Sequence, residues 1–359
     1  MEKLDKTINN TISLVKNNRT IQVYIVVNTA GATIPRDYAA TSDTILTEFL
    51  TDAEFQEIYD GIRSNGVQTR VFYDEESFIR TILAEKSYPA DTNTVVFNLS
   101  RNGMGVSKKA LIPAFCALLG LTTTGSNAYV TSLGRNKFHY SQIFSASGIS
   151  VPKQYVFDKT GWINGCPPDG QEVIAKPSYE AAARGISEQS VFPYTKKQEQ
   201  FVKELADGFQ QPILVQEFIR GYEIQVPLII CNSEINCLPI MGIDINSKRN
   251  LDNQILTYQR TFDDDYGFYA VTETEICKEK LLEIEYAAIR AARIIGIENY
   301  GRIDFRVTFE GHHYVTDIAT HPYIIRHSAF SHAFAKLGYM HSDLFAFVIG
   351  NALTTNQLR

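Results

Sequence analysis

A continuous run of apolar, mostly β-branched residues at 21–28 (IQVYIVVN) is the feature that most constrains the fold. It shows no alternation of apolar and polar side chains. Such a run is typical of a strand that is buried on both faces, as in a parallel sheet covered by helices. Further strands are predicted at 67–73 and 94–99. Amphipathic segments at 45–65, 75–84 and 109–119 alternate with these strands and are predicted as helices. This order predicts an α/β domain with a parallel sheet.

The pattern changes after Gly148, where short predicted strands follow one another with few helices between them. These strands are at 154–157, 172–176, 213–218, 224–231 and 236–243. Their spacing predicts an antiparallel sheet. Residues 246–269 are polar and suit a lid or binding loop. Residues 278–295 form an amphipathic helix pattern, and 301–308 and 313–318 read as two strands joined by a tight turn.

Composition and charge exclude several classes of protein. The chain has 359 residues, a net charge of −6 and 44% hydrophobic residues, which predicts a multidomain globular protein. A mildly acidic chain gains little from nucleic-acid phosphates or an anionic membrane surface, so we expect neither partner. No apolar run reaches the about 18 residues that span a bilayer. Five cysteines without a C-x-x-C pair fit reduced thiols in a cytoplasmic protein.

Two strand ends carry residues suited to a nucleotide. At 172–177 (EVIAKP) a strand delivers Lys176, and the small residues of 178–187 follow. A lysine and freely approachable backbone N–H groups are suited to phosphate, although a solvated strand end gives the same pattern. At 213–224 an apolar strand ends in a polar segment, a glycine and Glu223. An apolar slot for adenine, with the Glu223 carboxylate accepting from the ribose hydroxyls, fits this pattern. An ordinary hairpin with a solvated glutamate also fits it.

The third constellation consists of two acidic residues on neighbouring predicted strands. Asp304 and Asp317 lie on either side of a tight turn, and antiparallel strands can bring such residues within a few ångströms of each other. Two opposed carboxylates repel unless a cation joins them, and Mg²⁺ shared with substrate phosphates is the expected partner. Arg302 lies on the same face as Asp304 and can meet a developing negative charge. A solvated hairpin with two unrelated acids is the alternative.

Together these elements resemble the ATP-grasp superfamily, and most closely the D-alanine–D-alanine ligase family. The resemblance runs from about residue 21 to residue 349 and includes Asn136-Lys137 and the segment 148–152. It implies an α/β (α+β) protein with the ATP-grasp fold and an N-terminal Rossmann-like parallel-sheet domain. The implied domains are the N-terminal α/β domain at 1–130, the central ATP-grasp subdomain at 131–220, and the C-terminal subdomain with the metal and substrate site at 221–359.

The resemblance also implies roles for individual residues. The residues implied in ATP binding are Lys137, Lys176, Glu180, Ala182, Gly185, Gln216, Glu217, Phe218, Ile219 and Glu223. The implied Mg²⁺ ligands are Asp304 and Asp317. The implied catalytic cations are Arg302 and, in the lid, Arg260, with Lys248 and Arg249 as alternatives to Arg260. The implied substrate contacts are Ser328, His327 and Tyr323.

Several positions depart from the family pattern. The metal-binding strand usually reads glutamate, isoleucine, asparagine, whereas this chain has Asp317, Ile318 and Ala319. The phosphate loop carries alanines at 181–183 in place of glycine and serines, so that backbone donors remain and hydroxyl contacts are lost. Tyr323 replaces a glycine and reshapes the pocket for the acyl acceptor. These changes favour a substrate other than that of routine cell-wall synthesis.

The implied function is an ATP- and Mg²⁺-dependent ligase that joins a small carboxylate to an amino acid through an acyl phosphate. A specialised biosynthetic ligase, such as the mycosporine-type relatives, is one form of this prediction. Its partners would be these small molecules, and a homodimer stays open as the assembly. A nucleotide-binding ATP-grasp protein without ligase activity is the alternative, motivated by Ala319 and the alanine-rich loop. An ATP-grasp kinase is a third hypothesis.

Overall fold

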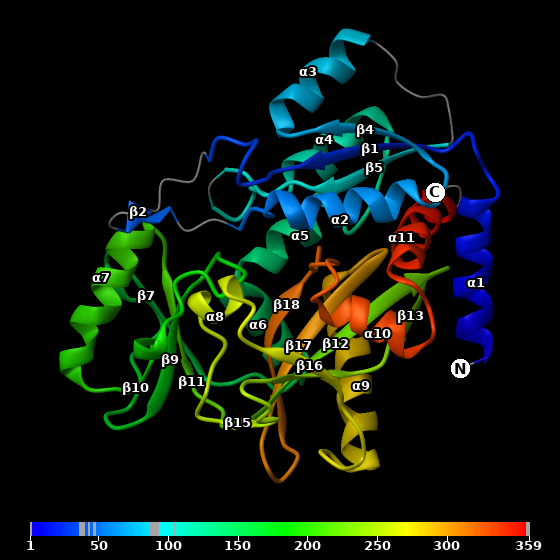
Figure 1. Ribbon diagram of the computed structural model, residues 1–359. Coiled ribbons are helices and arrows are strands. Elements are labelled where there is room, and N and C mark those ends of the chain that lie inside the picture. The colour runs from blue at the N-terminus through cyan, green and yellow to red at the C-terminus, as the bar shows by residue number, and fades with distance from the viewer. Residues whose placement is uncertain are drawn as a thin grey trace.

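The computed structural model describes residues 2–35, 40–41, 44–45, 48–85, 93–103 and 105–356 (Figure 1). Its strands form one parallel sheet, two larger antiparallel sheets and a small two-stranded pair. Helices cover the faces of the sheets, and the first and last helices, α1 (Glu2–Lys16) and α11 (His341–Asn356), lie side by side at one edge of the molecule. The predicted mixed α/β class is therefore confirmed.

The N-terminal part is the parallel sheet that the sequence predicts. Its strand order is β4-β1-β5-β6, and every pair is parallel. The strands are β1 (Gln22–Val27), β4 (Gln68–Phe72), β5 (Thr94–Leu99) and β6 (Thr122–Thr123). In β1, Val23, Ile25 and Val27 pack into one core cluster and Val26 into another, so the strand is buried on both faces. The helices of this part are α2 (Asp52–Arg63), α3 (Glu75–Glu85) and α4 (Leu111–Leu119).

The helix predicted at 45–65 is shorter than its apolar pattern suggested. Thr51 is the N-cap of α2. Its hydroxyl accepts a hydrogen bond from the Glu54 N–H at 3.1 Å, and the Glu54 carboxylate accepts one from the Thr51 N–H at 2.6 Å. This reciprocal capping box fixes the start of the helix at Asp52. Ile45 belongs instead to β3 (Thr44–Ile45), which pairs with β2 (Ala40–Thr41). Residues 46–47 lie outside the described part of the chain.

The middle of the chain forms a five-stranded antiparallel sheet in the order β10-β9-β11-β7-β8. Its strands are β7 (Gln154–Asp158), β8 (Gly161–Trp162), β9 (Glu172–Pro177), β10 (Val191–Pro193) and β11 (Ile213–Glu217). Helix α7 (Glu199–Phe209) packs on this sheet through its buried residues Val202 and Ala206. Two short 3-10 turns, Glu188–Ser190 and Lys196–Gln198, connect β9 to α7 around β10.

The C-terminal part holds a seven-stranded antiparallel sheet in the order β16-β14-β12-β17-β18, with β13 and β15 also pairing with β12. Its strands are β12 (Gly221–Cys231), β13 (Glu234–Cys237), β14 (Met241–Asp244), β15 (Asn250–Asp252), β16 (Gly267–Ala270), β17 (Tyr300–Val307) and β18 (His313–Ala319). The predicted strand at 236–243 is thus divided between β13 and β14. The single antiparallel sheet predicted from the sequence is two sheets.

The remaining helices cover and connect these sheets. They are α1 (Glu2–Lys16), α5 (Ala128–Arg135), α6 (Lys137–Ala146), α8 (Tyr258–Phe262), α9 (Lys278–Ile295), α10 (Ala329–Lys336) and α11 (His341–Asn356). Helix α9 covers the seven-stranded sheet, as its apolar stripe predicted. Helices α1, α10 and α11 share one core with β1 and β5, so the end of the chain packs against its beginning. The division at 1–130, 131–220 and 221–359 stays a prediction.

Nothing in the described ranges is a helix of the length and hydrophobicity that a bilayer crossing requires.

Candidate active site

A cavity of about 580 Å³ lies where the three main sheets meet. Residues of β9, β11, β12, β17 and β18 line it, together with the loop after β9 and the segment between β15 and β16. The loop after β5 and the end of α5 close it on the side of the parallel sheet. This volume is that of a site for a small molecule or cofactor. Most of the residues predicted from the sequence are brought together here.

The two predicted phosphate lysines enter the cavity from different elements. Lys137 is the first residue of α6, and its Nζ donates to the backbone oxygen of Glu180 and lies 3.7 Å from Asp317 Oδ1. Lys176 extends from β9, and its Nζ donates to Thr316 O at 3.1 Å. Burial lowers the pKa of Lys176 to about 8, against the opposing effect of Asp317. Two buried ammonium groups therefore flank Asp317, and both suit a polyanionic ligand.

The two predicted metal ligands face each other across neighbouring strands. Asp304 on β17 is the direct register partner of Asp317 on β18, and both line the cavity. Arg302 forms a two-point contact with Asp304, Nε to Oδ1 at 2.6 Å and Nη2 to Oδ2 at 2.7 Å. Burial raises the pKa of Asp304 to about 6, although Arg302 acts in the opposite direction.

Asp317 has a different environment from Asp304. The hydroxyl of the fully buried Tyr140 donates to Asp317 Oδ1 at 2.9 Å. Burial alone would raise the pKa of Asp317, but the charges of Lys137 and Lys176 outweigh it and lower the pKa. Tyr140 lies one helical turn after Lys137 on α6, so the same helix positions a phosphate lysine and a partner of the carboxylate.

The donor set fits a hard cation that is shared with a substrate. In the ranges that the structure describes, no cluster of three or more His, Cys, Asp or Glu residues could hold a metal by itself. Asp304 and Asp317 supply two carboxylates, and Ala319 supplies none. Mg²⁺ usually takes one or two protein carboxylates and completes its shell with substrate phosphates and water. The residues present therefore fit Mg²⁺ bound together with a phosphorylated ligand.

The predicted adenine and ribose residues lie together at the end of β11 and the start of β12. The cavity-lining residues of this group are Gln216, Glu217, Phe218, Ile219 and Glu223. Gln216 Nε2 is buried and has no hydrogen-bond partner among the described residues, so it is a donor available to a ligand. Gly221, the first residue of β12, has φ +136°, and a Cβ there would lie 2.0 Å from the Val307 carbonyl oxygen. Only glycine permits this turn.

The loop at 178–187 borders the cavity with its backbone. Ala182 and Ala183 both have φ near +53° and line the cavity, so the alanines hold a conformation that usually favours glycine. Gly185 does not line the cavity, and a Cβ at this position would lie 2.6 Å from Pro177 and 2.7 Å from Phe209, so its predicted contact with ATP stays a prediction. Glu180 borders the cavity, but its carboxylate accepts from Arg184 at 2.8 Å. Its predicted contact with ATP stays a prediction.

The predicted substrate residues lie beyond the two aspartates. Ser328 is the N-cap of α10: its Oγ accepts from the Ser331 N–H at 3.2 Å and donates to Ile325 O at 2.6 Å. The ring of His327 packs 4.6 Å from that of Tyr266. Tyr323 donates its hydroxyl to the backbone oxygen of Glu48 at 2.9 Å. Ser328, His327 and Tyr323 all line the cavity.

The predicted lid cation does not point into the site. Arg260 on α8 pairs with Asp265 at 3.0 Å and with Glu188 at 3.4 Å, and it does not line the cavity. Its alternative Arg249 pairs with Glu275 and lies over the ring of Tyr269. The sequence shows which residues of this loop are cationic, but it does not show whether their side chains point into the cavity. The catalytic role of Arg260 stays a prediction.

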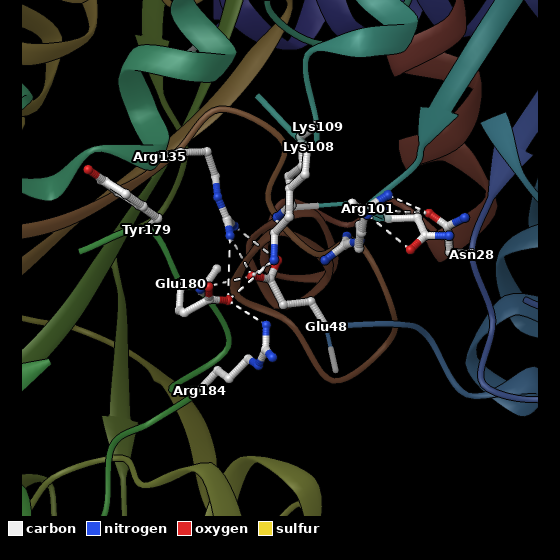
Figure 2. A network of polar contacts seen from close by, with 12 residues as sticks. Asn28, Glu48, Arg101, Lys108, Lys109, Arg135, Tyr179, Glu180 and Arg184 are labelled. Atoms are coloured by element: carbon white, nitrogen blue, oxygen red, sulfur yellow. Dashed lines mark hydrogen bonds and ion pairs between the residues drawn. The ribbon is translucent and has the colours of Figure 1, made fainter. Parts of the chain in front are cut away.

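Several basic residues that the sequence interpretation missed also line the cavity, Arg184 and Arg306 among them. Three of them lie on the side of the parallel sheet, and we call these three the basic wall: Arg101, Lys109 and Arg135. Figure 2 shows them converging from the loop after β5 and the end of α5. Glu48 accepts from Arg135 at 2.7 Å and pairs with Lys109 at 3.0 Å. The sequence did contain a clue to Arg101. Ligands of open α/β sheets bind beyond the carboxyl ends of the strands, and Arg101 directly follows the carboxyl end of β5.

The three sheets and the cavity between them define the class of this protein by its architecture, the ATP-grasp fold. The structure is similar to that of the D-alanine–D-alanine ligase from Bacillus anthracis complexed with ATP, with a TM-score of 0.67 and 16% identity over 94% of this chain and 99% of that one. It is also similar to the VanG D-Ala:D-Ser ligase from Enterococcus faecalis, with a TM-score of 0.64 and 16% identity over 93% and 99% of the two chains.

The sequence comparisons identify the family. The family model described as the D-ala D-ala ligase C-terminus matches residues 143–350. The D-alanine–D-alanine ligase of Bordetella petrii is 25% identical over 236 residues, which are 66% of this chain and 69% of that protein. That of Nitrosospira multiformis is 23% identical over 82% and 89% of the two chains. The chain belongs to the D-alanine–D-alanine ligase family. The predicted family is confirmed, and with it the class of ATP-dependent ligase.

Proposed function

We propose that this enzyme joins a small carboxylate to an amino acid, using ATP and Mg²⁺ and passing through an acyl phosphate. The arrangement of four side chains carries the proposal. Lys137 and Lys176 meet Asp304 and Asp317 at one cavity, and the two lysines come from parts of the chain far from the aspartates. Two cations beside two opposed carboxylates suit a triphosphate that shares a divalent cation with the protein.

The remaining roles follow from position along the cavity. The adenine would lie against residues 216–219 at the end of β11, where Nε2 of Gln216 is a hydrogen-bond donor without a partner among the described residues. The Glu223 carboxylate would accept hydrogen bonds from the ribose hydroxyls. Backbone N–H groups of the loop at 178–187 would approach the phosphates, because alanine side chains leave them accessible. The amino acid would bind beside His327 and Ser328, at the start of α10. We retain the domain boundaries 1–130, 131–220 and 221–359 within this proposal.

The chemistry has two steps. A carboxylate oxygen of the acyl donor forms a bond to the γ-phosphorus, and the bond to the β–γ bridging oxygen breaks, so ADP leaves. The amine of the second substrate then attacks the acyl carbon, phosphate leaves, and the amine loses a proton. Mg²⁺ would neutralise phosphate charge when bound to Asp304 and Asp317. Lys137 and Lys176 hold the phosphates, and Arg302 can stabilise the charge that develops on the transferring group.

Residues between β15 and β16 would exclude water during the reaction. Ile255, Leu256 and Phe262 of this segment line the cavity together with Tyr266. An acyl phosphate hydrolyses if water reaches it, so an apolar cover protects the intermediate. We propose that the substrate pair differs from two D-alanines, because Tyr323 and Ala319 depart from the family pattern. A mycosporine-type ligase remains one specific form of this proposal.

The direct test is turnover with pools of substrates. Purified protein is incubated with ATP, Mg²⁺, a pool of small acids and a pool of amino acids, while phosphate release and new amide masses are followed. The proposal predicts both, and predicts that Asp304→Asn loses them while keeping its fold. Asp158→Asn, a change on β7 outside the cavity, is the matched control. A new amide without phosphate release, or phosphate release with no amide, contradicts the proposal.

A nucleotide-binding protein without ligase activity is the second candidate. The observations that favour it are the missing third ligand at Ala319 and the loss of hydroxyl groups at Ala181–Ala183. Under this alternative, ATP and Mg²⁺ raise the melting temperature of the protein, but no acid and amine pair releases phosphate. A kinase would instead yield a stable phosphorylated product and no amide. The same incubation therefore separates all three.

A further inference from the structure

The basic wall carries more positive charge than its described partners balance. Glu48 is buried, and its carboxylate pairs with Lys108 at 3.2 Å as well as with Lys109 and Arg135. Three cations thus share the Glu48 carboxylate, and two of them, Lys108 and Arg135, also lie 3.3 Å and 3.8 Å from the carboxylate of Glu180. These charges together lower the pKa of Glu48 well below its ordinary value, although burial acts against them. Glu48 therefore stays ionised, but two carboxylates, Glu48 and Glu180, are shared among four paired cations and do not balance the positive charge of the wall (Figure 2).

Arg101 is the member of the wall that an anion can reach. It is 4% exposed, it lines the cavity, and its guanidinium lies 3.9 Å from the centre of the Tyr323 ring. No carboxylate within the described residues pairs with it. A guanidinium buried without a counter-charge costs several kcal/mol, and stacking on one tyrosine offsets only about 2 kcal/mol. The side chain is therefore held in a position that an anionic ligand would stabilise.

The lowered pKa of the neighbouring His321 is consistent with a positive electrostatic potential at the wall. His321 lines the cavity beside the wall, and both its ring nitrogens are buried without hydrogen-bond partners among the described residues. Burial, with the nearby charges of Lys109 and Arg101, lowers the pKa of His321 to about 3. A neutral imidazole at this point adds no charge, so the electrostatic attraction for an anion comes from the wall itself.

The wall comes from elements of the chain other than those expected to bind the nucleotide base and the amino-acid carboxylate, although Arg101 stacks on Tyr323. The adenine residues come from β11, and Ser328 begins α10, whereas the wall comes from the loop after β5 and the end of α5. Arg135 ends α5 two residues before Lys137. The wall therefore borders the phosphate end of the cavity, on the side of the parallel sheet. An acyl donor whose carboxylate meets the γ-phosphate would extend toward it.

We propose that the basic wall binds a second anionic group of the acyl donor, so that the donor is a dicarboxylate or a phosphorylated acid. This inference rests on the proposed ligase function, and it names the substrate class of that site. Arg101 presents a planar guanidinium suited to two-point recognition of a carboxylate or phosphate. Tyr323 fixes that guanidinium by stacking. The tyrosine that departs from the family pattern thus becomes part of the selection of the donor.

The first experiment compares matched donors with the unaltered protein. Succinate is paired with butyrate, and phosphoglycerate with glycerate, each with ATP, Mg²⁺ and a pool of amino acids. We expect kcat/KM for at least one dianionic donor to exceed that of its partner by about 10- to 100-fold, as for a charge-assisted hydrogen bond. The pair that shows the preference distinguishes a carboxylate from a phosphate. Equal or better use of butyrate and glycerate would overturn the proposal.

The second experiment removes the unpaired guanidinium. Arg101→Gln is expected to raise KM for the dianionic donor by about 10- to 100-fold, with KM for ATP unchanged. Arg293→Gln, an exposed arginine at the end of α9, is the matched control and should change neither. If Arg101→Gln raises KM for ATP and leaves KM for the donor unchanged, the wall serves the triphosphate and the proposal is wrong.

A binding measurement separates this proposal from the proposed function. Calorimetry with succinate, butyrate, phosphoglycerate and glycerate requires no turnover. Tighter binding of a dianion that Arg101→Gln abolishes would support the anion site, even if no donor released phosphate and the ligase proposal failed. If neither dianion binds more tightly than its partner, the anion site is overturned, whatever the turnover experiment shows.

Discussion

Arg302 and Asp304 lie two positions apart on β17 and are joined by two hydrogen bonds, at 2.6 Å and 2.7 Å. Both oxygens of the predicted metal ligand therefore already have a cationic partner. A metal ion that binds Asp304 has to compete with the guanidinium or share the carboxylate with it. The same arginine would then be freed to face the transferring phosphoryl group.

Replacement of Arg302 should therefore separate metal binding from turnover. We expect Arg302→Gln to lower the Mg²⁺ concentration that gives half-maximal thermal stabilisation in the presence of ATP. Turnover should fall by about 100-fold or more, because a donor to the transition state is lost. Arg220→Gln, which removes a partly exposed arginine paired with Glu172 outside this cavity, is the control. A variant with normal turnover and an unchanged Mg²⁺ requirement would refute this interpretation.

That Lys176, Asp304 and Asp317 meet at one cavity could be predicted because each belongs to a local pattern, whereas their roles toward phosphate and metal stay proposals. Lys176 ends an apolar strand before a proline, and Asp304 and Asp317 flank one tight turn whose hairpin register is confirmed. The basic wall could not be found in this way. Glu48, Arg101 and Arg135 are far apart in the chain and meet only through the packing of the parallel sheet against the rest of the molecule. The ion pair between Glu48 and Arg135 is therefore a property of tertiary structure.

The limits of helix α2 show a different kind of error. The apolar spacing continues upstream of Thr51, so periodicity alone extended the helix toward residue 45. The capping box formed by Thr51 and Glu54 was visible in the sequence and overrides the periodicity. The direction of Arg260 is a third case, because a polar lid does not reveal from its sequence which side faces the cavity.

Ser328 has a structural role that must be separated from its predicted role in substrate binding. Ser328→Ala removes the N-cap of α10 and should lower the free energy of unfolding by about 1 kcal/mol. If the hydroxyl also meets the amino acid, KM for that substrate rises while KM for ATP does not. Asn127→Ala removes the N-cap of α5, together with a hydrogen bond from Asn127 to Glu298, and is the control for loss of a helix cap that does not line the cavity. Equal effects of both variants on KM would leave Ser328 with a structural role only.

His321 should make the stability of the protein depend on pH. Its pKa is about 3 in the folded protein, below its ordinary value of 6.5. The unfolded chain therefore binds a proton that the folded chain excludes, and stability is present above pH 6.5 and lost as pH falls toward 3. The loss from this residue approaches about 1.4 kcal/mol per pH unit.

The matched comparison is His321→Phe, which cannot take up a proton. Urea unfolding of the native protein and the variant at pH 8 and pH 5 should show the variant gaining relative stability at pH 5. The exposed His312→Gln should leave the pH dependence unchanged. Parallel pH curves for the native protein and His321→Phe would mean that His321 is protonated in the fold.

Gly221 should tolerate no side chain. At φ +136° and with a Cβ position 2.0 Å from Val307 O, alanine would push apart β12 and β17. We expect Gly221→Ala to lower the free energy of unfolding by about 3 kcal/mol or more, and to weaken ATP binding. Gly338→Ala, at φ +89° with no atom within 4 Å of the new Cβ, should cost about 1 kcal/mol. Similar losses for both would contradict the steric argument.

The passage of oxygen from the acyl donor to phosphate tests the account most directly. The donor acid is labelled with ¹⁸O in its carboxylate and incubated with ATP, Mg²⁺ and the amino acid. The account predicts that the released phosphate carries one ¹⁸O atom, because a carboxylate oxygen attacks the γ-phosphorus and stays with it when the amide forms. Phosphate that carries no label, released at the rate of amide formation, would contradict an acyl phosphate at this site.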